Sequence, residues 1–178
     1  MRTHIVLVAG TADAAAQIRT RELLDRLCFD YVFFAKTVPT LALAMLATID
    51  EKASQVRGVE ALGHDTIEQI LIQEGVADNA VVAKYLDNPH IRAEMEPYST
   101  QALAALQEVL PPPSDHDDMV LVVVPSAPLA GALAHAWAKG SEKLSAIFSV
   151  PQMRFQPGKG FIAMFFDDGS LASLEVPE

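Results

Sequence analysis

Short uninterrupted apolar runs alternate along the chain with longer segments in which apolar residues recur every three or four positions. The runs are rich in β-branched and aromatic residues and predict buried strands, because a strand covered on both faces needs no polar positions. The longer segments predict amphipathic helices between the strands. Strands are expected at residues 5–8, 31–35 and 119–124, and helices at residues 14–27, 41–49 (with Pro39 in the first turn) and 128–139.

The middle of the chain carries weaker signals, and most of them favour helices. Asp65-Thr66 and Ser99 are residue types that cap helix N-termini. Three consecutive prolines end the last of these segments, because proline cannot continue a helix. The expected elements are a weak strand at residues 56–62, a helix after Asp65-Thr66, a short segment at residues 81–86 that ends near Asn88-Pro89, and a helix at residues 99–110 capped by Ser99.

The C-terminal part predicts a hairpin. Two strand-like runs at residues 161–166 and 171–176 are separated by Asp168-Gly169, a dipeptide typical of tight turns. Strands that alternate with helices and then form a hairpin indicate a mixed sheet with helices on both faces. The expected fold is a single α/β domain over residues 1–178, a three-layer α/β/α sandwich with a mostly parallel mixed sheet.

Composition narrows the classes of partner. The chain has 178 residues, 51% of them apolar, and a formal net charge of -10. A negative field repels phosphate backbones and anionic lipid, so neither nucleic acid nor a membrane surface is an expected partner. The apolar runs are too short for a secretory signal or a bilayer span, which favours a cytoplasmic protein. The single cysteine, Cys28, excludes an internal disulfide and is expected to be a buried thiol.

Individual polar motifs have simple structural interpretations. The five histidines show no metal-ligand spacing, so no metal or cofactor is predicted. Asp115-His116-Asp117-Asp118 could bind a metal through oxygen and imidazole, but a solvated acidic loop is the expected structure. Ser126 precedes a helix that Pro128 enters, which predicts an N-cap rather than a nucleophile, because no Gly-x-Ser-x-Gly elbow surrounds it. The glycines at positions 158 and 160 lack P-loop spacing and predict a turn into the hairpin.

Three segments together carry a family resemblance. Residues 5–13 form a strand followed by a turn, residues 29–44 contain an aspartate, a strand and a helix start, and residues 121–133 contain a late strand followed by Pro128-Leu129-Ala130-Gly131. In order and spacing these segments resemble the histidine phosphatase superfamily, which includes phosphoglycerate mutases and small phosphohistidine phosphatases. The resemblance implies a phosphoglycerate mutase-like fold with its site at the carboxyl edge of the sheet.

The residues that would perform phosphatase chemistry in that family are replaced here. Val8 stands where the resemblance implies an arginine, Ala9 where it implies the nucleophilic histidine, and Ser126 where it implies the second histidine. Pro39 stands at the phosphate-binding arginine, or Thr40 if the alignment shifts by one residue. None of these side chains can attack phosphorus or hold phosphoryl oxygens. The sequence therefore predicts no catalytic residue and a non-catalytic, binding or regulatory role for an unidentified small ligand or protein partner.

For the binding role, the candidate ligand-binding residues near the expected site are Gly10, Thr11, Lys36 and Ser126, and Arg19 could also reach it. Two alternatives to a binding role stay open. Rebuilt hydrolytic chemistry would use Ser126, Asp13, Lys36 or His64, although a cap is the simpler account of His64-Asp65. A structural homodimer could form by pairing an exposed strand edge at residues 161–166.

Overall fold

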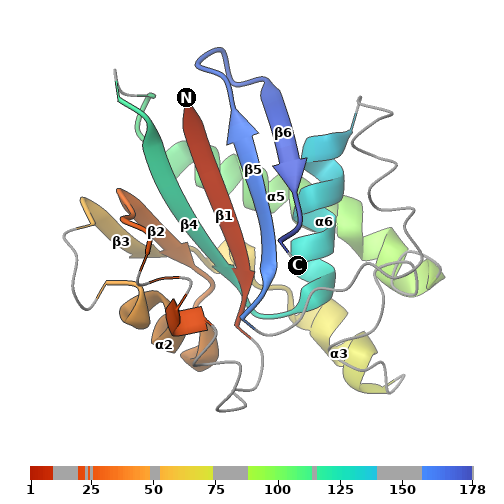
Figure 1. Cartoon of the computed structure of the whole chain (residues 1–178). Helices are drawn as coiled ribbons and strands as arrows, with labels where there is room; N and C mark the ends of the chain where they lie inside the picture. Colours follow the sequence, from red (N-terminus) through yellow and green to blue (C-terminus); the bar gives the residue numbers. More distant parts are fainter. Residues whose placement is uncertain are drawn as a thin grey trace.

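The computed structural model describes residues 1–9, 20–22, 24, 26–48, 53–73, 88–113, 116–139 and 158–177. Strands and helices alternate through most of the chain, and two strands close it (Figure 1). The elements in chain order are β1 (Arg2–Val8), β2 (Tyr31–Phe34), α2 (Val38–Leu46), β3 (Gln55–Gly58), the 3-10 turn η1 (Glu60–Leu62), α3 (Asp65–Gln73), α5 (Pro89–Val109), β4 (Asp118–Val124), α6 (Ala127–Ala138), β5 (Gly160–Phe165) and β6 (Leu171–Glu175).

The described strands form one six-stranded sheet in the order β3-β2-β4-β1-β5-β6. The first four strands in that order run parallel, and the C-terminal hairpin adds two antiparallel strands beside β1. The predicted mostly parallel mixed sheet is confirmed. Strands β1 and β4 lie at its centre and are buried along most of their length, as their continuous apolar runs indicate.

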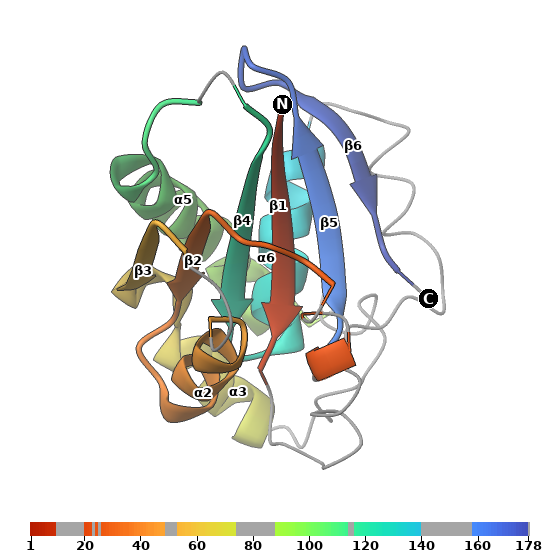
Figure 2. The same ribbon diagram turned by 60° about the vertical axis from the view of Figure 1, so that its left-hand side comes forward.

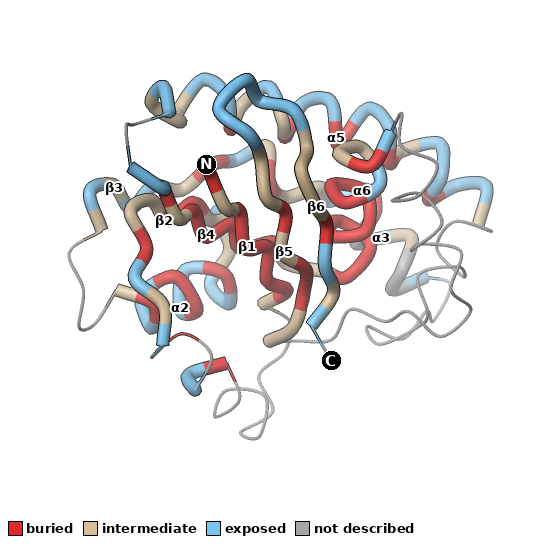
Figure 3. The backbone as a smooth tube through the Cα atoms, turned by 45° about the horizontal axis from the view of Figure 1, so that its top comes forward, coloured by how far each residue is buried: buried red, intermediate tan, exposed pale blue. Residues whose placement is uncertain are grey.

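Helices cover both faces of the sheet, so the predicted three-layer sandwich is also confirmed. Because alternate residues of a strand point to opposite faces, β1 contributes to two cores. Ile5 and Leu7 pack with Leu43 of α2, whereas Val6 and Val8 pack with residues of α5 and α6. Figure 2 shows α2 in front of the sheet and α5 and α6 behind it, and Figure 3 shows the buried centre of the sheet.

The predicted start of the helix at residues 99–110 is wrong. Helix α5 begins ten residues earlier, where the Asn88 side chain accepts hydrogen bonds from the backbone N–H groups of His90 (2.9 Å) and Ile91 (3.1 Å). Ser99 lies inside the helix, and its hydroxyl donates to the Glu96 carbonyl. Asn88-Pro89 is therefore an N-cap followed by proline at the first helical position, a strong start signal that resembles a helix end in isolation.

Three smaller expectations also change. The strand expected at residues 56–62 is real only in β3, and η1 follows it, because β3 pairs with β2 over just four residues. Cys28 is exposed rather than buried, since its neighbour Phe29 takes the core position. Strand β5 is paired on both sides, by β1 and by β6, so it is not the exposed edge on which the homodimer was expected.

Other expectations are met or fall beyond the described residues. The hairpin turn is confirmed: Gly169 has a φ of 82°, and Asp168 accepts the Ser170 backbone N–H at 2.8 Å. Residues 20–22 and 24 of the helix expected at 14–27 are helical. Residues 26 and 27 are not helical, so the helix ends earlier than expected. Residues 14–19, 23 and 25 of that helix and the segment at 81–86 lie outside the described residues.

Candidate functional site at the carboxyl edge of the sheet

The fold brings the segments that carry the family resemblance to one edge of the sheet. Strands β1 and β4 pair in parallel from Arg2 with Asp118 to Val8 with Val124, so both end at the same edge. The chain continues there into Ala9 and Ser126. Strand β2 ends at this edge too and leads through Lys36 to Pro39. Gly10, Thr11, Asp13 and Arg19 lie outside the described residues.

Val8 and Ala9 use this position for packing and backbone pairing. Val8 is buried, and its backbone bonds to the turn before β5, with N–H donating to the Lys159 carbonyl (3.0 Å) and C=O accepting from Gly158 (2.8 Å). The Ala9 N–H donates to the Val124 carbonyl at 2.9 Å. Neither side chain carries an atom that could attack phosphorus or bind an anion.

Neither alignment of the second segment supplies a cation. Pro39 is exposed in the first turn of α2, where a missing N–H costs nothing. Thr40 is fully buried, and its hydroxyl lies within hydrogen-bonding distance of the carbonyls of Ala35 and Thr37, to one of which its single proton is donated. Thr40 therefore stabilises the start of α2, because its hydroxyl is used in hydrogen bonds to the backbone there.

Ser126 occupies the N-cap position of α6, as its sequence context predicts. Its carbonyl accepts the Ala130 N–H at 3.2 Å. Its hydroxyl makes no capping hydrogen bond and is a buried oxygen without a partner in the described part of the chain. Among the described residues, no base lies within hydrogen-bonding distance of this hydroxyl to activate it.

The two remaining polar candidates have partners elsewhere. The Lys36 ammonium lies 3.6 Å from the Glu60 carboxylate, and both side chains are exposed. His64 precedes α3, and its Nδ1 accepts the Ile67 backbone N–H at 3.3 Å, so His64 caps this helix in place of Asp65-Thr66. Its Nε2 lies 3.6 Å from Glu94 Oε2.

All five histidines lie in the described part of the chain, so a substitute nucleophile can be sought among them directly. Only His64 follows the carboxyl end of a strand, through η1. The other four lie on β1, in the first turn of α5, before β4 and near the end of α6: His4, His90, His116 and His135. None of the five histidines directly follows the end of β1, β2 or β4 in the sequence.

Two acidic residues where β4 begins bind the N-terminal residues of the chain. Asp117 lies 2.9 Å from the Met1 amino group, and Asp118 forms a buried ion pair with Arg2 at 2.7 Å. Among the residues that the structure describes, no three histidine, cysteine or acidic side chains gather as a metal site would require. Asp117 and Asp118 thus both have cationic partners within the protein.

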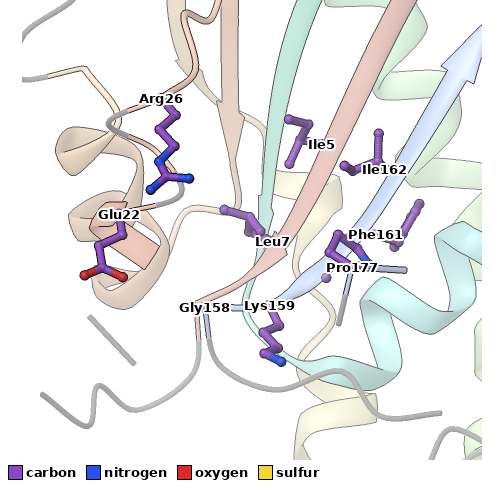
Figure 4. Close-up of a pocket in the computed structure, with 10 residues that line it drawn as sticks. Ile5, Leu7, Glu22, Arg26, Gly158, Lys159, Phe161, Ile162 and Pro177 are labelled. Carbon is purple, nitrogen blue, oxygen red and sulfur yellow. The ribbon is translucent and has the colours of Figure 1, made fainter. Parts of the chain in front are cut away.

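A cavity of about 360 Å³ begins beside the carboxyl end of β1 (Figure 4). Its walls are mainly apolar, and two cations and one carboxylate stand at its rim. Figure 4 shows Ile5 and Leu7 of β1 near Phe161 and Ile162 of β5, with Glu22 and Arg26 to the left and Lys159 below. Gly160 permits the close approach of the two strands, because a Cβ there would lie 1.8 Å from the Val6 carbonyl oxygen.

Sequence reasoning missed this cavity. Its lining comes from four separate parts of the chain, which meet only because β5 pairs antiparallel with β1. The one available signal was Gly158-Lys159-Gly160, which the sequence places correctly as the turn into β5. Its proximity to β1 follows from the sheet order alone.

Solved structures share this architecture at low sequence identity. A phosphoglycerate mutase from Plasmodium falciparum superposes with a TM-score of 0.52 at 14% identity, over 99% of this chain and 89% of that one. The chain has the phosphoglycerate mutase fold. Bacillus stearothermophilus YhfR gives a TM-score of 0.59 at 12% identity, over 99% and 96% of the two chains. Mycobacterial hydrolase 1 gives 0.53 at 13% identity, with the same coverage.

The phosphoglycerate mutase fold confirms, at the level of architecture, the resemblance to the histidine phosphatases that the sequence carries. Comparison with family models and with curated proteins gave no match. No helix among the described residues is long and apolar enough to cross a membrane.

Proposed function

We propose that this protein is a non-catalytic relative of the histidine phosphatases that binds a ligand and does not turn over phosphate esters. One observation carries the proposal: at the edge where this fold would place its chemistry, the strand ends lead to Val8, Ala9, Pro39 and Ser126. None of the five histidines directly follows β1, β2 or β4, whose ends build this edge.

Phosphoryl transfer through a histidine requires an imidazole nucleophile and donors that stabilise charge on the phosphoryl oxygens. Losing a single such donor costs on the order of 10²–10³ in rate. Here both histidine positions and both arginine positions of the resemblance hold side chains without an imidazole or a cation. The expected turnover is therefore that of the uncatalysed reaction.

The cavity of Figure 4 supports a binding role for a small anion with an apolar body. Its apolar walls suit a hydrocarbon or a ring, and Arg26 and Lys159 provide positive charge at its rim against the single carboxylate of Glu22. In a chain with a net charge of -10, such a local excess of cations favours an anionic group at this place.

Rebuilt hydrolytic chemistry receives less support from the contacts. Lys36 pairs with Glu60, and both ring nitrogens of His64 face groups of their own. Ser126 has no base within hydrogen-bonding distance in the described part of the chain. Lys36, His64 and Ser126, the described residues of this alternative, therefore do not act on one another.

Turnover and binding measured on the same purified protein test the proposal. With p-nitrophenyl phosphate and with 3-phosphoglycerate, we expect no rate above buffer, both for the unaltered chain and for His64→Asn. Turnover that disappears in His64→Asn would contradict the non-catalytic assignment.

For binding, octanoate serves as the probe in isothermal titration calorimetry. We expect saturable binding that Lys159→Gln or Arg26→Gln weakens about fivefold, in keeping with a partly solvated ion pair. Lys139→Gln is the matched control, because Lys139 pairs with Glu96 on the opposite side of the sheet and lines a different groove. Equal weakening in all three variants would show that the cavity is not where the anion binds.

A further inference from the structure

Helix α2 is apolar on every side, although only one of its sides packs on the sheet. Its buried residues are Thr40, Leu43 and Ala44, and Thr40 is also its only polar residue. A helix that is apolar all round is normally buried on all sides, because an outer apolar face in water is unfavourable. Figure 3 shows exposed residues on α2 beside the buried ones.

Most of the large apolar side chains that the described residues expose lie on the α2 side of the sheet. Val56 of β3 belongs to this group, because it pairs in register with Val32, which packs in the core beneath α2. Single exposed apolar residues are common, whereas a group of them marks a contact surface. The group, called the α2 face below, consists of residues with exposed fractions from 36% to 81%: Val38, Leu41, Met45, Leu46 and Val56.

The charge of the chain indicates what covers the α2 face. Residues 37–49 contain no charged side chain, although the chain has a net charge of -10. Two copies of such a chain repel each other, and the repulsion opposes contact least where neither surface is charged. An uncharged helix also has no group with which to select a strongly acidic or basic partner, and the net charge repels anionic lipid.

Charges of both signs border the α2 face. Lys36 precedes α2 and lies 3.6 Å from Glu60, and both side chains are exposed. In a contact with twofold symmetry the same surface meets itself, so a border of one sign would repel its copy. A border with one positive and one negative group can instead form ion pairs between the copies.

We propose that the α2 face is the contact surface between two copies of this chain, related by a twofold axis with one α2 against the other. Val38, Leu41 and Met45 are spaced by three and four residues, so they lie along one side of the helix and are buried together in the contact. The surface is small, so the dimer is weak. The contact is independent of the proposed function and does not use strand β5.

Sedimentation equilibrium of the purified chain at about 1–500 μM tests the proposal, because weak dimers dissociate in this range. We expect the average mass to rise with concentration from that of one chain towards that of two. Raising NaCl from about 50 to 300 mM should strengthen association, because salt screens the repulsion between the acidic chains and exposed ion pairs contribute little. A monomer at every concentration, or association that salt weakens, would overturn the proposal.

Two substitutions at opposite ends of α2 test the surface itself. Met45→Glu and Val38→Glu place a carboxylate in the contact and should each weaken association more than about tenfold, because the charge loses its water on assembly. Phe166→Glu is the matched control, since Phe166 is similarly exposed in the hairpin between β5 and β6 and gains the same charge away from α2. Circular dichroism identifies a variant that does not fold, and the other then provides the test. Association that a folded Met45→Glu or Val38→Glu variant retains unchanged would overturn the proposal.

Vesicles of phosphatidylcholine distinguish a lipid occupant from a second copy. We expect the chain to stay in the supernatant when the vesicles are sedimented. A chain that is monomeric in solution and sediments with the vesicles, but not as Met45→Glu, would show that lipid covers the α2 face and would contradict the dimer.

Discussion

At the scale of single residues, Gly160 decides how closely β5 approaches β1. A Cβ at this position would meet the Val6 carbonyl oxygen at 1.8 Å, a backbone atom that cannot move without breaking the ladder. We expect Gly160→Ala to lower the free energy of unfolding by about 3 kcal/mol or more. Urea denaturation followed by circular dichroism measures the change.

Gly63→Ala is the matched control for that substitution. The nearest atom to a Cβ at position 63 lies 3.7 Å away, which is ordinary contact, and the backbone angle φ of -99° suits any residue. A loss of less than about 0.5 kcal/mol is expected there. If the two variants were equally stable, the close approach of β5 to β1 would be wrong.

His4 makes stability depend on pH. Its pKa falls to about 3 in the folded protein because burial disfavours the charged ring, with Arg2 adding repulsion, whereas the unfolded chain keeps an ordinary value near 6.5. Below about pH 6.5 the unfolded state binds more protons, so stability decreases as the pH falls from 6.5 towards 3. Between pH 7 and pH 4.5 this group accounts for a loss of about 2–3 kcal/mol.

His4→Phe isolates that contribution. The variant should lose about 2 kcal/mol less than the unaltered protein when urea denaturation at pH 7 is compared with that at pH 4.5. Asp118, paired with Arg2 beside this site, is unchanged in both proteins and cancels in the comparison. An identical pH dependence in the two proteins would show that His4 titrates normally.

The identity of the edge residues could be predicted at this scale, but their contacts could not. Val8, Ala9 and Ser126 can be assigned to the edge from the sequence alone once the ends of β1 and β4 are placed. For example, the contact between His64 and Glu94 joins residues thirty positions apart. It forms only because α5 packs against η1 and α3. Cys28 illustrates the same limit, since its neighbour Phe29 occupies the core.

At the scale of elements, the strands were the most predictable part because their apolar runs match burial on both faces. Helix α5 was not, although its buried residues follow a helical spacing from the first turn: Ile91, Met95, Tyr98, Ala102 and Leu106. Its polar positions and Pro97 weaken that pattern, and packing against α6 stabilises the helix in spite of them.

The start of α5 can be tested through its cap. Asn88→Ala removes the acceptor for the His90 and Ile91 N–H groups and should cost about 1 kcal/mol. Asn88→Asp keeps an acceptor at the same place and should be nearly neutral. Both values come from urea denaturation. Equal stability of Asn88→Ala and the unaltered chain would mean that the helix begins elsewhere.

At the scale of the whole molecule, the order of strands and helices indicated the sandwich, because parallel strands need crossovers that cover the sheet. The cavity of Figure 4 could not be predicted from the order of the elements. It is lined by segments far apart in sequence, brought together where the C-terminal hairpin lies against β1. The chain thus shares the phosphoglycerate mutase fold.

The central claim is that no imidazole here can take up a phosphoryl group. The most direct measurement is incubation of the protein with acetyl phosphate, followed by intact-mass and peptide mapping under alkaline conditions that preserve phosphohistidine. We predict no phosphoryl group on any of the five histidines. A phosphohistidine that forms at His64 and disappears in His64→Asn would contradict the account.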